Sequence, residues 1–237
     1  MENKFRRYLL YALGEMLLVV IGILIALQID NWNENRKDRA LELTLLEEVH
    51  TALENDLQMV ENWLSTLEKT NQSFIRVVEL KAEKQDTFDE LYEHLSRVQS
   101  YGIMLSFTKS PYEGLMSIGL DKIKNPELRQ QLSSFYGHSI PVTEDFINDV
   151  VRTGLHLRSE LFADIFDVNA VKGEAGIRNS FKISSHDQYY QNPKFDEMLL
   201  SAGWSLPVAI RVMKDLKQNG DRLSLLINNE LGLQPTD

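Results

Sequence analysis

One carboxylic acid, Glu15, interrupts an apolar run of membrane length, residues 9–29 (LLYALGEMLLVVIGILIALQI). An ionised carboxylate is costly among lipid chains, so an acid at such a position faces a neighbouring helix or a water-filled path and is a candidate for function. Two interpretations of Glu15 stay open. It is either a protonated carboxyl group hydrogen-bonded across an oligomer interface, or a site that carries protons or cations.

The helix face that carries Glu15 is rich in small residues. Its members recur at alternating spacings of three and four, as in a helix–helix interface, and they are Ala12, Glu15, Val19, Gly22, Ala26, Ile29 and Asn33. Gly22 and Ala26 form a small-xxx-small pair, which lets a second backbone approach closely. Because a single span cannot shelter its own acid, we expect its neighbour to be another copy of the chain or a different membrane protein.

A polar cluster, residues 30–34 (DNWNE), stands where this helix would leave the bilayer. Solvated amides and carboxylates at that level are compatible with a simple interfacial anchor. If the spans oligomerise, Asp30, Asn33 and Glu34 would instead form a ring at the mouth of a pore, where such rings favour the entry of cations. The sequence leaves both interpretations open.

The remaining candidates for chemistry are weak. Glu47 and His50 have the spacing of a di-iron ligand pair, but that site needs a second copy of the motif and two further glutamates, and we expect His50 to be structural or on the surface. The sequence has no Gly-x-Ser-x-Gly, no phosphate-binding glycine loop and no His-Glu-x-x-His. We therefore predict no catalytic residue, no metal ligand, no cofactor and no enzymatic activity.

The composition excludes several classes of partner and site. The formal net charge of −10 argues against a nucleic-acid partner. The absence of cysteine excludes disulfides, thiolate zinc sites and cysteine-ligated iron–sulfur clusters. The part of the chain that follows the apolar run is long enough for one domain with its own core.

Insertion of residues 9–29 into a membrane is favoured despite Glu15. The 13 Leu, Ile and Val side chains contribute about 4–8 kcal/mol, whereas one acid near the centre costs about 2.5–3.5 kcal/mol. Tyr8 and Tyr11 at one end and Trp32 at the other stand where interfacial aromatic anchors stand. No small-x-small cleavage site follows the run, so we expect an uncleaved anchor in contact with membrane lipid.

The basic residues suggest an orientation. Lys4, Arg6 and Arg7 crowd residues 1–8, and a short basic tail stays in the cytoplasm. Three basic residues beyond the run equal them in number, but these are mixed with acids and lead into a long domain, which translocates largely regardless of its charge. We expect residues 1–8 in the cytoplasm, a transmembrane helix over 9–29 and the rest of the chain outside the cytoplasm.

The helical period continues after the membrane. Residues 30–83 are predicted to form one long helix, continuous with the span, because they contain neither proline nor glycine and carry an apolar stripe. The stripe consists of Leu46, Val49, Leu53, Leu57, Val60, Leu64, Leu67, Asn71, Phe74 and Val78. It is either a coiled-coil interface between subunits or the core face of a bundle within one chain, and its irregular spacing favours the bundle.

Residues 84–237 are predicted to form helices that pack on this long helix, so the fold class is all-α. Capping boxes at 87–90 and 110–113 and an Asn-Pro start at 125–127 mark three helix beginnings. Further helices are expected over 141–166, 194–201 and 206–231, with a pause at 219–220. Residues 167–192 are expected to form a loop, since they contain glycines and a polar run and show no period-two alternation.

The sequence also carries a resemblance. Residues 4–15 (KFRRYLLYALGE) and 18–34 (LVVIGILIALQIDNWNE) resemble the N-terminal signature of a bacterial family of single-span membrane proteins of unknown function. Residues 110–129 (SPYEGLMSIGLDKIKNPELR) are similar to the middle region of that family. The resemblance implies a bacterial inner-membrane anchor and a helical extracytoplasmic domain, and it brings no catalytic residues.

Two functional hypotheses follow. The first is a homo-oligomeric, single-span scaffold or binding module with a helical domain outside the cytoplasm. The second is a proton or cation channel, or a subunit of an ion-driven machine, that uses Glu15 in the membrane. A role as a ligand sensor is disfavoured because we find no cytoplasmic output domain.

Overall fold

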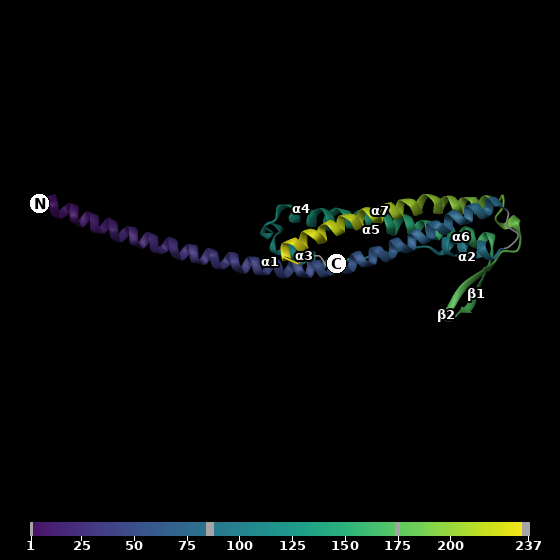
Figure 1. Ribbon diagram of the computed structural model, residues 1–237, viewed down its shortest axis with the longest axis horizontal. Helices are drawn as coiled ribbons and strands as arrows, with labels where there is room; N and C mark the ends of the chain where they lie inside the picture. Colours follow the sequence, from purple (N-terminus) through teal and green to yellow (C-terminus); the bar gives the residue numbers. More distant parts are fainter. Residues whose placement is uncertain (1, 84–87, 174–175, 234–237) are drawn as a thin grey trace.

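A computed structural model describes residues 2–83, 88–173 and 176–233, with side chains described from Leu13 onward except at Ser100, Gly173 and 176–179. The protein is a long rod with a helical bundle built around its distal half (Figure 1). Helices dominate the described residues, and the only strands among them form one hairpin. The all-α expectation is therefore confirmed, apart from this hairpin.

Helix α1 (Glu2–Glu83) is a single helix of 82 residues, about 120 Å long at 1.5 Å per residue. Every described side chain from Leu13 to Trp32 is exposed, and Glu42 is the first buried residue. From Leu46 onward the predicted stripe packs inside the bundle of one chain, which supports the bundle over the coiled coil. The last residue of the predicted stripe, Val78, is not in the core, since it is 44% exposed.

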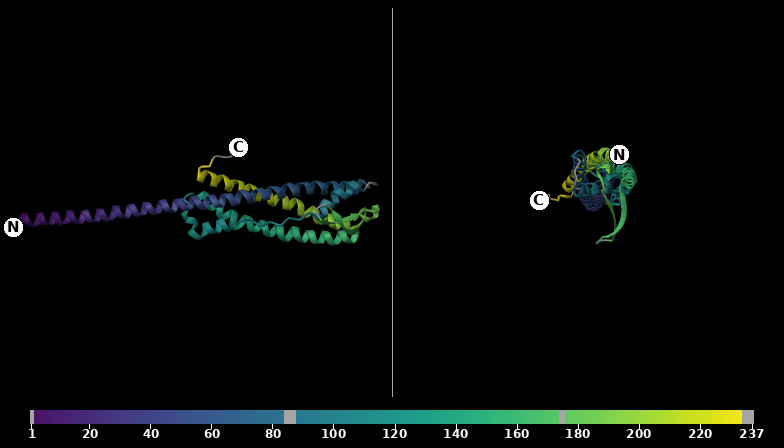
Figure 2. Two further views of the ribbon diagram at one scale, coloured as in Figure 1. Left: turned by 90° about the horizontal axis from the view of Figure 1, so that it is seen from below. Right: turned by 90° about the vertical axis from the view of Figure 1, so that its right-hand side faces the viewer.

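Helix α7 (Pro193–Leu231) runs back alongside α1 and is one helix, not the two that were expected (Figures 1 and 2). Gly220 lies inside it because the helices approach closely there. A Cβ atom on Gly220 would collide with Leu57 of α1 and lie 3.2 Å from Phe135. Pro207 is also tolerated within α7, where the buried face continues on both sides through Leu206 and Ala209. Packing here overrides local helix preference.

The other helices fill the space beside α1 and α7. They are α2 (Asp89–Ser100), α3 (Ser110–Ile118), the 3-10 turn η1 (Leu120–Lys122), α4 (Pro126–Ser134), α5 (Ile140–Phe146) and α6 (Arg152–Ile165). Two π-helical turns, η2 (Phe135–Ser139) and η3 (Ile147–Val151), join α4, α5 and α6 without a break. The expected start of a separate helix at Pro141 is therefore wrong, because a π turn accommodates the missing hydrogen bond of Pro141.

The predicted loop over 167–192 contains a hairpin, which corrects the sequence-based expectation. Strands β1 (Asp167–Gly173) and β2 (Gly176–Lys182) pair antiparallel, with Asp167 opposite Lys182, and the 3-10 turn η4 (His186–Gln188) follows. The described side chains of β1 are exposed or only partly buried. Because β1 shows no alternation of buried and exposed side chains, a period-two pattern could not reveal it.

The predicted helix starts have mixed outcomes. Asn125 caps α4, since its side-chain oxygen accepts hydrogen bonds from the backbone amides of Glu127 and Leu128. The box at Ser110 is wrong: Lys109 occupies the cap position of α3, and no side chain caps that helix. The box that begins at Thr87 lies outside the described residues. Asn192 caps α7 in the same way as Asn125 caps α4.

Candidate functional site

The predicted membrane face lies on the free part of α1. Val19, Gly22, Ala26 and Ile29 are exposed together with Glu15, and a Cβ atom on Gly22 would meet nothing within 4 Å. Ala12, Tyr8 and Tyr11 lie on the same helix, but their side chains are outside the described part. This is the one helix among the described residues that is long and apolar enough to span a membrane.

The polar cluster, residues 30–34, does not form a binding site within one chain. Asp30, Asn33 and Glu34 lie on one helix of one chain, so a ring of these residues would need several copies of the chain. Trp32 is 64% exposed, with the guanidinium carbon of Arg36 5.5 Å from its ring centroid. An exposed Trp–Arg pair of this kind suits an interfacial anchor.

Ion pairs fasten α1 where it enters the bundle. Arg39 contacts Glu42 at 2.7 Å and Glu230 of α7 at 2.5 Å. Glu42 is 1% exposed and also accepts a hydrogen bond from the backbone amide of Lys124. The carboxylates of Glu42 and Glu230 raise the pKa of Arg39. An exposed pair, Lys122 with Asp38 at 2.5 Å, lies beside this cluster, which we call the basal clamp (Arg39, Glu42, Glu230).

The most unusual feature of the bundle is an extended segment, residues 101–109, that runs between helices. Alternate side chains are buried, namely Tyr101, Ile103, Leu105 and Phe107. No strand pairs with this segment in the described structure, and side chains from the helices bind its backbone instead. Both the amide and the carbonyl of Leu105 bond to Asn148, at 3.3 and 3.4 Å, and the amide of Phe107 donates to Glu144 at 3.3 Å.

Asp56 of α1 binds the end of the extended segment from the opposite side. Its carboxylate accepts hydrogen bonds from the amide of Thr108 at 2.9 Å and from the Thr108 hydroxyl at 3.3 Å. Asp56 is 6% exposed, and burial raises its pKa, an effect that the two bonds from Thr108 partly offset and that Glu144 reinforces. Burial and the nearby Asp56 also raise the pKa of Tyr136, which stacks on Tyr112.

Arg158 of α6 holds the beginning of the same segment and is fully buried. It donates to the carbonyl oxygen of Tyr101 at 3.0 Å, and its guanidinium carbon lies 3.9 Å from the Tyr101 ring centroid. Its Nε and Nη1 have no hydrogen-bond partner in the described structure, and no ion pair of Arg158 is found there. Burial lowers the pKa of this guanidinium, because desolvation disfavours the charged form.

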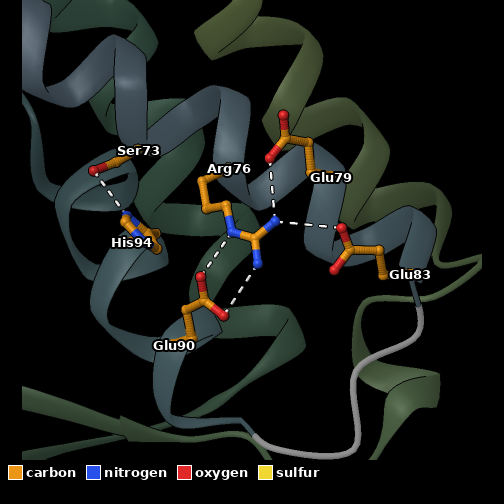
Figure 3. Close-up of polar contacts among 6 residues, drawn as sticks. All are labelled: Ser73, Arg76, Glu79, Glu83, Glu90 and His94. Carbon is orange, nitrogen blue, oxygen red and sulfur yellow. Dashed lines mark hydrogen bonds and ion pairs between the residues drawn. The ribbon is translucent and has the colours of Figure 1, made fainter.

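At the distal end, Arg76 connects α1 to α2 (Figure 3). It makes two hydrogen bonds with Glu90 of α2, at 2.7 and 3.2 Å, and also contacts Glu79 and Glu83 of its own helix. These carboxylates raise the pKa of Arg76, and Arg76 lowers the pKa of Glu90. The cluster is largely exposed, so we assign it a role in holding the start of α2 against α1.

The Glu47 and His50 pair forms no metal site in the described structure. His50 lies 3.6 Å from Glu54, one helical turn further along, and no group of three or more Asp, Glu or His side chains that could hold a metal is found among the described residues. His94 bonds to Ser73 at 3.1 Å (Figure 3), which indicates packing between α1 and α2.

Sequence reasoning missed the contacts of the extended segment. Asn148 and Glu144 each lie about 40 positions from the backbone groups that they bind, so no local pattern links them. One signal was present: Asp56 lies next to Leu57 of the apolar stripe of α1, and Glu144 and Asn148 are one turn apart, each beside a buried residue, Thr143 and Ile147. Polar residues at such positions need partners.

Comparison with known proteins gives one finding. Residues 15–119 match a family of unknown function (DUF6090). The match begins at Glu15 and takes in the rest of α1, α2, the extended segment and α3, so it covers the apolar helix and the first half of the bundle. No curated protein matches the chain, and no solved structure does.

Proposed function

We propose that this protein is a homo-oligomeric scaffold or binding module anchored in the bacterial inner membrane by α1, with its bundle outside the cytoplasm. One observation carries the proposal: the apolar segment and the central helix of the bundle are the same helix. Because the helix is continuous, the position and rotation of its apolar segment set the position and rotation of the part inside the bundle. Whatever fixes the apolar segment in the membrane therefore also fixes the orientation of the bundle.

The distance between membrane and bundle follows from the same helix. From Asp30, where the apolar run has ended, to Glu42, the first buried residue, the helix rises about 18 Å. The basal clamp joins α1 to α7 at that point and thereby limits movement of α1 relative to the bundle. The bundle would stand clear of the lipid headgroups, as suits a module that presents a surface to a partner.

The orientation rests on charge and on domain length. The basic residues Lys4, Arg6 and Arg7 favour a cytoplasmic N-terminus. The long domain on the other side translocates largely regardless of its own charge. The match to a family of unknown function supports a shared design of apolar helix and stalk, but it assigns no activity.

Association of the membrane segments is proposed because the described structure of one chain leaves Glu15 exposed. Its face of α1 carries Gly22 and Ala26, which suit close approach of a second helix. A second copy would place Glu15 against protein instead of lipid. The alternative, a proton or cation path through the oligomer, is favoured only by the acid itself.

The Glu15→Gln variant separates the two. Glutamine keeps a hydrogen-bonding group of the same size but cannot ionise. We expect the native and variant proteins to have the same mass in detergent, a multiple of one chain, and to leave the proton permeability of reconstituted vesicles equally low. A native protein that weighs as one chain would overturn the scaffold proposal. A proton or cation flux that the variant abolishes would favour the ion path.

A further inference from the structure

A cavity of about 660 Å³ lies at the distal end of the bundle, between α2, α6 and the hairpin. This volume is within the range of sites for small molecules. The hairpin leaves the bundle beside α2 and α6 (Figure 1), so it forms one wall of the cavity and the two helices form the others. The basal clamp, the contacts of the extended segment and the Arg76 cluster all lie outside the wall of this cavity.

The polar side chains that line the cavity are serines, one glutamine and one histidine. Gln99 of α2 and His156 and Ser159 of α6 all lie in the wall. These three side chains make no hydrogen bond within the described structure, so their donors and acceptors remain available to a ligand. Among the described lining residues there is no Asp, Glu, Lys or Arg. A ligand with a net charge would find no counter-ion here.

Two further serines, Ser96 and Ser180, line the wall, and its other side chains are apolar and include two aromatic rings. Phe162 of α6 and Phe181 of β2 pack edge to face, with ring centroids 4.6 Å apart, and Tyr92 of α2 stacks on Phe181 at 4.3 Å. Phe181 thereby fastens the hairpin to both helices. The cavity is lined by apolar side chains as well as by side chains that can form hydrogen bonds.

We propose that this cavity binds a neutral sugar of one or two rings. A sugar ring presents C–H groups on its faces, which pack on aromatic and aliphatic side chains, and hydroxyl groups at its rim, which exchange hydrogen bonds with amide, hydroxyl and imidazole groups. The lining matches both properties and the absence of charge. The inference goes beyond the anchoring role, and neither the membrane orientation nor the oligomer is needed for it.

The test is ligand binding by the full chain in phospholipid nanodiscs, since the headgroup of a maltoside detergent is itself a disaccharide. Saturation-transfer NMR with maltose and N-acetylglucosamine, each at about 10 mM, detects weak binding. Glucuronate serves as the charged comparison. Ala163→Trp fills the cavity from an exposed position on α6, and Ala82→Trp is the matched control on an exposed position of α1 outside the wall.

We expect transfer to at least one neutral sugar and little to glucuronate. Ala163→Trp should weaken the binding at least about tenfold, and Gln99→Leu should weaken it in the same direction, while Ala82→Trp leaves it unchanged. Circular dichroism of each variant checks that the fold is kept. No transfer to either neutral sugar, or equal transfer in the filled and native proteins, would overturn the proposal. Stronger binding of glucuronate would also overturn it.

Discussion

The side chain of Asn148 bonds to both backbone groups of Leu105, a residue 43 positions earlier in the chain. A single carboxamide thus takes the place of a neighbouring strand, since it supplies one acceptor and one donor in the spacing of a peptide group. The π turn η3 carries Asn148, and π turns often occur where a side chain serves a special contact.

Replacing Asn148 should destabilise the bundle. In Asn148→Leu both backbone groups of Leu105 lose their partner, and each buried group left without one costs about 1–3 kcal/mol. Denaturant unfolding monitored by circular dichroism measures the loss. Asn62→Leu, at an exposed position of α1, is the control and should change the free energy of unfolding by less than about 0.5 kcal/mol. Equal midpoints for the two variants would refute this role of Asn148.

Asp56 should make stability fall as the pH rises. Burial raises the pKa of Asp56 above its ordinary value of 3.8, so the folded state binds the proton more tightly than the unfolded state. The contribution of this group is fully present below 3.8 and is lost as the pH rises through the higher folded pKa.

Asp56→Asn should remove that pH dependence, because asparagine can still accept the bond from Thr108 but does not ionise. The free energies of unfolding of the native and variant proteins, measured across the acidic range, should diverge in favour of the variant as the pH rises. Asp215→Asn, at an exposed position of α7, should follow the native curve. Parallel curves for native protein and Asp56→Asn would contradict the assignment.

Arg158 is a buried cation with no carboxylate partner among the described residues, and its removal should stabilise the fold. Arg158→Met keeps much of the side-chain volume and removes the cost of desolvating the charge, a change that in other buried cases gains about 1–4 kcal/mol. Thermal unfolding should show a higher midpoint for this variant. A lower midpoint would mean that the bond to Tyr101 and the contact with its ring outweigh the desolvation cost.

The basal clamp and the exposed pair beside it should differ in strength. Arg39→Met leaves Glu42 buried without its cation and should cost about 2–4 kcal/mol, somewhat less than a fully buried pair because Arg39 is partly exposed. Lys122→Met removes only an exposed partner of Asp38 and should cost less than about 1 kcal/mol. Chemical denaturation of both variants tests the ranking, and a larger loss in Lys122→Met would reverse it.

Gly22 should matter to association but not to the fold of one chain. Gly22→Ile places a branched side chain on the Glu15 face and should weaken self-association by about 1–3 kcal/mol, as overpacking does. Gly14→Ile, on another face of α1 and equally free of neighbours, is the matched control. Sedimentation equilibrium in detergent measures both, and identical association constants would rule out this face as the interface.

Much of the architecture could be predicted from the sequence. The apolar run, the continuous helix after it and the buried stripe from Leu46 to Leu67 follow from residue type and from the helical period, which are local properties. The cap at Asn125 is local in the same way. The hairpin was missed because the described side chains of β1 do not alternate between buried and exposed. The join across Pro141 was missed because the π turn there depends on packing with other helices.

By itself, the sequence determined that a membrane-length helix with one acid continues into a helical domain, because hydrophobicity and periodicity act over neighbouring residues. Only the tertiary structure decided which polar groups meet: Asn148 with Leu105, Asp56 with Thr108, and the free side chains around the distal cavity. These contacts join residues far apart in the chain. Burial raises the energetic cost of losing any of them, since a buried polar group must find its partner within the fold.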